Sequence, residues 1–121
     1  MCAAIRWQIR YRTPRHKVHE GGQQKTLTRE EYAGRLNAAI PDEPEIPAIM
    51  EHVWHWFWVL SERRQRGMSG PQPLQWTEIN AWREMMRVMI LPEEIDVLLM
   101  MDSAWLDAVG QFRDEEQDSK R

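Results

Sequence analysis

The sequence predicts a small, mainly α-helical domain of about four helices, preceded by a short β-strand or hairpin or by a disordered basic segment. Three observations lead to this fold class. The chain has 121 residues, of which 42% are hydrophobic, enough for one modest core. Apolar residues recur at spacings of three and four over much of residues 28–112. Proline and glycine interrupt this pattern where helices are expected to end.

We expect three segments along the chain. Residues 1–27 form the basic N-terminal segment, residues 28–112 the helical domain, and residues 113–121 a charged tail that frays because it has no apolar anchor. The longest apolar run is too short to span a bilayer, and no apolar signal follows the first residues. We therefore expect a soluble intracellular protein. The single cysteine, Cys2, has no partner for an internal disulfide, which fits a reducing compartment.

The N-terminal segment has the pattern of β-structure. Residues 3–11 alternate between apolar and polar side chains, which predicts a strand that ends at Pro14. The Glu20-Gly21-Gly22-Gln23 sequence is a turn signal, so Lys17–Glu20 and Gln23–Leu27 are expected to pair as a hairpin. An isolated hairpin is marginally stable in water. The segment is therefore either disordered or ordered only against the helices or a partner.

Charge is unevenly distributed along the chain. The net charge is −3, yet the first 29 residues hold seven of the 16 basic residues and one of the 19 acidic residues. Such a split indicates a basic arm for nucleic acid, an acidic surface, or two segments that attract each other in the fold. Trp7 and Tyr11 lie between arginines and are able to stack on single-stranded nucleic acid. The acidic remainder argues against a dedicated nucleic-acid binder.

The first helix is expected over about residues 29–39. Thr28 and Glu31 form a capping box, in which each side chain accepts from the other residue's backbone N–H. Leu27 and Tyr32 occupy the two positions of a hydrophobic staple. Pro41 is expected to stop this helix.

The second helix, over about residues 47–66, contains three tryptophans within five residues. Trp54, Trp56 and Trp58 also alternate as in a strand, but about 20 residues without a breaker favour a helix. The arginines that follow Ser61 suit the negative end of the helix dipole. Each ring buries about 150–250 Å² when it is enclosed. Either this helix is the centre of a compact domain, or part of its aromatic surface is left for a partner.

Two further helices complete the predicted domain. Thr77 is expected to cap the third helix, whose apolar face includes Met86 and Met89 together with Ile79 and Trp82. The fourth helix starts at Pro92, where acidic residues face the positive dipole end. Its predicted inner face consists of Ile95, Leu98, Leu99, Trp105, Leu106 and Val109.

The sequence shows no set of residues for catalysis or for a cofactor. It has neither a glycine-rich phosphate loop nor a nucleophile elbow. His52 and His55 have a spacing that metal ligands use, but polar residues at the edge of an aromatic helix explain them as well. Asp102 falls within the apolar stripe of the fourth helix and therefore needs a hydrogen-bond donor. A tryptophan N–H or an arginine that ends the second helix is able to supply it, in a structural role.

The candidate partner-binding residues are aromatic residues and methionines. Methionine is common both in irregular cores and on adaptable binding surfaces. Met86 and Met89 are expected in the core, whereas Met85, Met100 and Met101 cannot all point inward with their neighbours. The predicted partner-binding set is Trp54, Trp56, Trp58, Trp76, Trp82, Met85, Met100 and Met101.

The stretch from about Ile46 to Val109 resembles the tail assembly chaperones of long-tailed bacteriophages. The resemblance rests on the order of four pieces. They are the aromatic run His52–Leu60, then Arg66-Gly67-Met68-Ser69-Gly70, then Pro73-Leu74-x-Trp76-x-Glu78-Ile79-x-Ala81-Trp82, and last Met100-Met101-Asp102-Ser103-Ala104-Trp105-Leu106. Residues 1–27 have no counterpart in this resemblance.

The resemblance implies a helical, non-enzymatic protein of the bacterial host cytoplasm. Members of that family bind the tape-measure protein, keep it soluble, recruit tail-tube subunits and are absent from the finished particle. Self-association is expected as well. Two alternatives stay open from the residues: an inhibitor of a host protein, which blocks a basic surface, or a structural tail or connector component of the virion.

Overall fold

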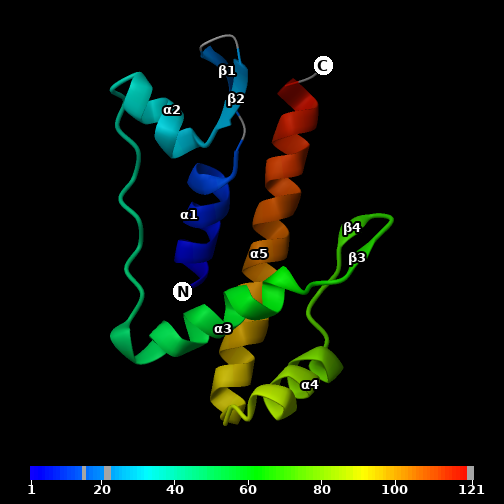
Figure 1. Cartoon of the computed structure of the whole chain (residues 1–121). Helices are drawn as coiled ribbons and strands as arrows, with labels where there is room; N and C mark the ends of the chain where they lie inside the picture. Colours follow the sequence, from blue (N-terminus) through cyan, green and yellow to red (C-terminus); the bar gives the residue numbers. More distant parts are fainter. Residues whose placement is uncertain (15, 21–22, 120–121) are drawn as a thin grey trace.

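The computed structural model describes residues 1–14, 16–20 and 23–119, and it confirms a mainly helical fold. Within these ranges the chain forms five α-helices and two short antiparallel hairpins (Figure 1). The helices are α1 (Cys2–Arg12), α2 (Arg29–Arg35), α3 (Glu51–Glu62), α4 (Trp76–Met86) and α5 (Pro92–Ser119). The hairpins pair β1 (His16–Glu20) with β2 (Gln23–Leu27), and β3 (Arg66–Gly67) with β4 (Gly70–Pro71).

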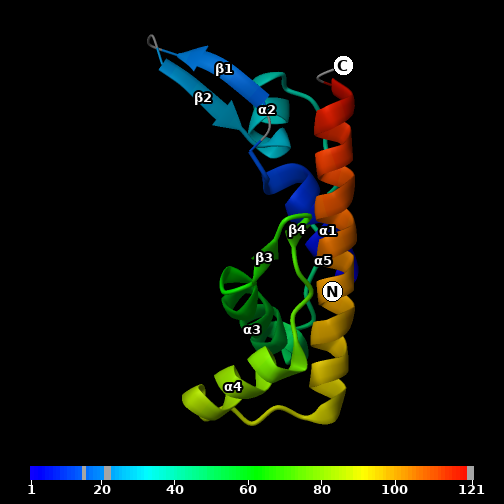
Figure 2. The ribbon, with the colours of Figure 1, turned by 90° about the vertical axis from the view of Figure 1, so that its right-hand side faces the viewer.

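Helix α5 is the longest element, and the other helices are arranged along it (Figures 1 and 2). Helix α1 lies beside the C-terminal half of α5 and runs in the same direction. The Cys2 thiol donates to the Met100 carbonyl, and Arg10 lies 3.4 Å from Glu115. Helix α3 crosses α5, and α4 lies near the N-terminal end of α5. The hairpin β1–β2 and α2 lie together at the opposite end (Figure 1).

The core lies where α1, α3 and α5 meet. Its completely enclosed side chains come from these three helices: Ile5, Val53, Phe57, Leu98 and Met101. Leu74 and Ile79 connect the start of α4 to the same cluster. Burial of each such aliphatic or aromatic side chain contributes roughly 1.5–3 kcal/mol. The core therefore fixes α3 across α5 and places the tryptophans of α3 around its edges.

The strand prediction for residues 3–11 is wrong, because these residues form α1. Ile5 and Ile9 pack toward α5. Trp7 and Tyr11 instead stack on each other with ring centroids 5.2 Å apart, and the Trp7 indole donates to the Pro41 carbonyl. A helix that is covered on two sides carries apolar residues on both, and this produces the apparent alternation of period two.

Basic residues of the N-terminal region form ion pairs with acidic residues of the rest of the chain. Arg12 pairs at 2.8 Å with Glu43, which lies in the connector between α2 and the 3₁₀ turn before α3 (residues 36–47). It also pairs with Glu30 of α2 at 3.6 Å. Arg10 and Arg29 both pair with Glu115 of α5. The basic N-terminal region and the acidic remainder therefore attract each other, as one of the sequence interpretations proposed.

The β1–β2 hairpin confirms the predicted pairing, with Leu27 opposite His16. The capping box of α2 is also confirmed, since Thr28 accepts from the Glu31 N–H at 3.2 Å and Glu31 accepts in return. However, α2 ends at Arg35 rather than near residue 39. Asn37 has a φ of 54° and ends the helix there, before Pro41 is reached.

Three other helix limits differ from the predictions. Helix α3 covers Glu51–Glu62 after a 3₁₀ turn at Ala48–Met50, so the arginines after it are not helical. Helix α4 starts at Trp76, and its N-cap is Gln75, so the predicted cap by Thr77 is wrong. The tail prediction is wrong for residues 113–119, which extend α5, because the ion pairs of Glu115 anchor them.

Candidate partner-binding surface

The tryptophans of α3 lie on the two flanks of that helix. Its inner face consists of Val53, Phe57 and Leu60, which are buried against the core. Trp54 and Trp58 stack edge to face on one flank, with centroids 5.7 Å apart. On the other flank, Trp56 lies 6.0 Å from Trp82 of α4. All four rings are half-buried. The predicted aromatic set is therefore neither fully enclosed nor freely exposed.

A contact between His52 and Glu94 lies beside Trp56. His52 packs edge to face on Trp56 at 4.8 Å and contacts Glu94 at the start of α5. Glu94 also accepts a hydrogen bond from the Leu91 N–H at 2.9 Å. The Leu91 hydrogen bond and, next, the His52 contact hold the pKa of Glu94 below its usual value. Helices α3 and α5 are thus connected beside the aromatic cluster.

Asp102 of α5 holds the segment that leads into α4 in place. The Leu74 N–H donates to Asp102 Oδ2 at 3.0 Å, and Asp102 Oδ1 lies 2.5 Å from Arg64 Nη2. Arg64 also lies over the Trp105 ring at 4.1 Å and donates to the Gln72 carbonyl. The hydrogen-bond donor to Asp102 is therefore the Leu74 N–H, which the sequence did not predict, whereas Arg64, one of the arginines expected to end the second helix, supplies the neighbouring positive charge. Arg64 reaches Asp102 because the chain has left α3.

A groove of about 450 Å³ separates α4 from the first turns of α5. One wall is the face of α4 that carries Trp76, Ile79, Asn80 and Arg83, and the other wall carries Pro92, Ile95 and Asp96. Trp76 is 73% exposed at this groove. An aromatic residue beside an unfilled apolar groove is typical of the anchor positions of protein interfaces.

Several methionines of α4, α5 and the loop between them are exposed. Met85 is 83% exposed, and Met100 is also exposed. The prediction that Met86 and Met89 belong to the core is wrong, because both are exposed. Helix α4 ends at Met86, and Arg87, with a φ of 53°, changes the direction of the chain before Met89. Met101 is fully buried in the core, so it offers no surface to a partner in this conformation.

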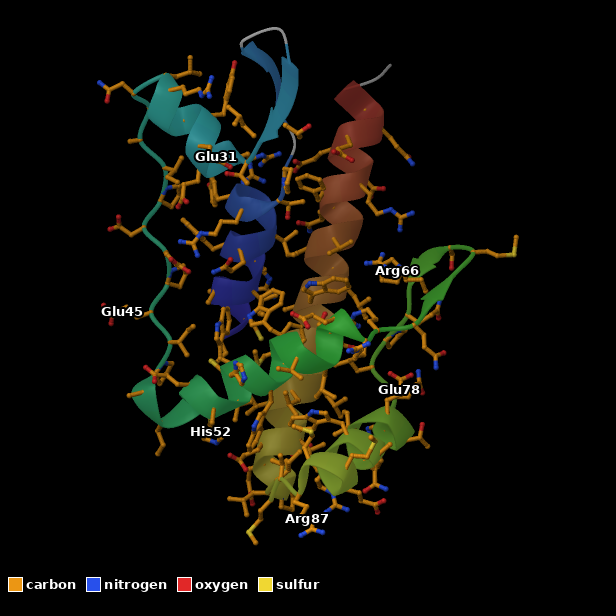
Figure 3. All side chains as sticks on the ribbon, in the orientation of Figure 1. Glu31, Glu45, His52, Arg66, Glu78 and Arg87 are labelled. Carbon is orange, nitrogen blue, oxygen red and sulfur yellow. The ribbon has the colours of Figure 1, made fainter. Side chains whose placement is uncertain are left out.

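A second hollow, of about 590 Å³, lies between the connector and Trp54. Three of its six lining residues are acidic, namely Glu43, Glu45 and Glu51, and the others are Pro44, Ile46 and Trp54. Figure 3 shows Glu45 on the connector, pointing away from the helices. The two hollows therefore differ in character, since the one beside Trp76 is apolar and this one is negatively charged.

His52 and His55, whose spacing metal ligands also use, have different surroundings in the structure. In residues 1–14, 16–20 and 23–119, no group of three His, Cys, Asp or Glu side chains is able to hold a metal ion. His52 instead contacts Glu94, and His55 is exposed. No helix in the described part of the chain is both long enough and apolar enough to cross a membrane.

Three of the seven residues that line the groove were not predicted from the sequence. Ile79 was expected to be buried, and Trp76 was among the candidate residues, but Asn80, Arg83 and Asp96 were not. The available signal was the spacing of positions 76, 79, 80 and 83, which share one face of a helix. Because this face mixes polar and apolar residues, the sequence pattern did not indicate a groove wall.

Comparison with known proteins supplies a family for this arrangement. A family model described as phage tail assembly chaperone matches residues 30–107, which are 78 of the 121 residues. The match includes α3, α4, the first half of α5 and therefore both hollows. No curated protein and no solved structure matched the chain.

Proposed function

The chain belongs to the phage tail assembly chaperone family, and from that membership we propose that it binds the tape-measure protein and recruits tail-tube subunits during tail assembly. It acts in the cytoplasm of the bacterial host and works by binding rather than by catalysis. The family assignment confirms the resemblance that the sequence showed over about Ile46–Val109.

One observation supports this proposal above the others: Trp76 is 73% exposed beside the apolar groove of α4 and α5. Tape-measure proteins have long helical stretches with apolar stripes, and such a stripe fits a groove of this kind. Met85 and Met100 are exposed outside the lining of the groove, and such flexible apolar side chains are common on adaptable binding surfaces. The half-buried Trp54, Trp56, Trp58 and Trp82 do not line the groove, and we propose them as a second part of the partner-binding surface.

The test is retention of the tape-measure protein of the same phage by the immobilised chain. We expect Trp76→Ala to lower retention at least about tenfold, because removal of an aromatic anchor costs about 2 kcal/mol or more. Leu36→Ala is the matched control, since Leu36 is also an exposed apolar residue but follows α2 at the other end of the molecule (Figure 1). Trp56→Ala is less informative, because Trp56 stacks on Trp82 and its loss also weakens the fold.

Two results would contradict the proposal. One is the absence of retention by the wild-type chain, and the other is equal retention by wild type and Trp76→Ala. Mass spectrometry of purified particles addresses the alternative of a structural tail component, because an assembly chaperone is expected to be missing from them.

A further inference from the structure

We propose that the groove between α4 and α5 is filled by α4 of a second copy of the chain, so that two copies form a twofold-symmetric dimer. The inference does not depend on tape-measure binding. It rests on the shape of the groove, on the spacing of the residues in its α4 wall, and on the charges of its two walls.

Each copy carries both a protruding part and a cavity that accepts it. Trp76 protrudes from the rim of the groove, and the floor beneath it includes Ile79 of α4 and Ile95 of α5. In a twofold dimer the same patch serves both copies, so every contact occurs twice. One exposed indole and one open apolar groove per chain therefore satisfy each other completely when two chains meet.

The α4 wall has a spacing that suits an antiparallel helix pair. Positions 76, 79, 80 and 83 form a single face and are symmetric about its centre. When two α4 helices cross in opposite directions, position 76 of one copy faces position 83 of the other. Trp76 then lies against the guanidinium group of Arg83 from the second copy, which is a favourable cation–π pair.

The charges of the two walls are opposite. Arg83 lies on the α4 wall and Asp96 on the α5 wall. Arg83 donates to Asn80 and lies 3.7 Å from Glu84, its neighbour in the sequence. Among the described residues, no ion pair includes Asp96. An α4 helix that enters the groove from a second copy places its own Arg83 near Asp96, and it receives the same contact in return.

This self-complementarity makes a second copy the expected occupant of the groove when no tape-measure protein is bound. Another helix would have to carry its own apolar anchor and its own basic residue at matching positions. The chain already carries both, at Trp76 and Arg83, on the face that lines the groove. The dimer covers that groove, so a binding partner that uses Trp76 has to displace the second copy.

The test is sedimentation equilibrium of the full chain, with charge exchange across the groove. We expect wild type to dimerise, and Arg83→Glu and Asp96→Lys each to raise the dimer dissociation constant at least about tenfold, because each places like charges opposite one another twice. The Arg83→Glu/Asp96→Lys double variant is expected to dimerise again. An equimolar mixture of the two single variants is expected to form the heterodimer, since every pair in it is then opposite in charge.

Matched controls are available elsewhere on the surface. Arg63→Glu and Asp107→Lys make the same charge changes at exposed positions outside the groove, and both should leave the dimer unchanged. Circular dichroism of each variant verifies that the helices are intact. A wild type that stays monomeric at about 100 μM, a concentration that would detect even weak self-association, overturns the proposal. Dimerisation that neither single variant weakens, or that the mixture fails to restore, also overturns it. Retention of the tape-measure protein is measured separately, so the two proposals can fail independently.

Discussion

Asp102 Oδ1 of α5 lies 2.5 Å from Nη2 of Arg64, and both side chains are almost completely buried. The carboxylate also accepts from the Leu74 N–H, whereas Oδ1 has the guanidinium charge as its partner without a hydrogen bond of ordinary geometry. Arg64 in turn lies on the Trp105 ring. This pair fixes the segment between α3 and α4, and with it the position of the groove.

Asp102→Ala should destabilise the protein by about 3–5 kcal/mol, because it leaves the Arg64 charge buried and unpaired. Urea denaturation followed by circular dichroism measures the loss. The Arg64→Met/Asp102→Leu double variant is the informative control, because it removes both charges and keeps the volume. Its stability should lie much closer to that of wild type. Equal stability of the single and double variants would show that the charge is not the source of the effect.

Glu94→Gln should lower stability at neutral pH and have little effect in acid. Because the pKa of Glu94 is lower in the folded than in the unfolded chain, the unfolded chain binds more protons. The stabilisation is therefore complete at a pH well above the usual glutamate pKa of about 4.3, and it is lost as the pH falls through the lower pKa of the folded state. Urea midpoints between about pH 7 and pH 3 measure the difference.

Glu93→Gln is the matched control for that series, since Glu93 lies in the same first turn of α5 and is exposed. It removes a charge at the positive dipole end but not the contacts with Leu91 and His52. A pH profile of Glu94→Gln that matches the profile of Glu93→Gln would assign the effect to the dipole alone.

Local chemistry made some features predictable from the sequence. The capping box of Thr28 and Glu31 depends on four consecutive residues, so it could be identified without the rest of the fold. The need of Asp102 for a hydrogen-bond donor was also predictable, because an acid in an apolar stripe has to be satisfied, but its donor, the Leu74 N–H, was not.

Features that depend on the packing of distant segments could not be predicted in this way. Helix α1 has a strand-like pattern because α5 and the connector cover two of its sides. Met101 is buried because it lies where α1, α3 and α5 meet, whereas Met86 is exposed because it is the last residue of α4 and lies outside that core. The groove exists only because α4 and α5 meet at one end, and no spacing within either helix reveals that arrangement.

Arg87→Gly should stabilise the protein by about 0.5–1 kcal/mol. Arg87 has a φ of 53°, in the left-handed region where a residue with a Cβ is strained by about 1–2 kcal/mol. Glycine removes this strain, although its more flexible unfolded state offsets part of the gain. Asn37→Gly is the comparison, because Asn37 has a φ of 54° but asparagine tolerates the region well. Its change in thermal midpoint should be smaller than that of Arg87→Gly, and the reverse order would argue against backbone strain.

Glu115→Ala should destabilise the protein by about 1 kcal/mol, near the upper end for surface ion pairs, because two arginines converge on this carboxylate. The Arg29 side chain is 15% exposed, so its pair with Glu115 is better shielded from solvent than the 3.4 Å pair of Arg10. The pairs connect the end of α5 to α1 and to the first turn of α2. Loss of these pairs should therefore speed amide hydrogen exchange over residues 113–119 more than elsewhere in α5. Asp118→Ala removes an exposed acid from the last turn, and it should change neither stability nor exchange measurably. If both variants exchange at the wild-type rate, apolar contacts and not ion pairs hold this end of the helix in place.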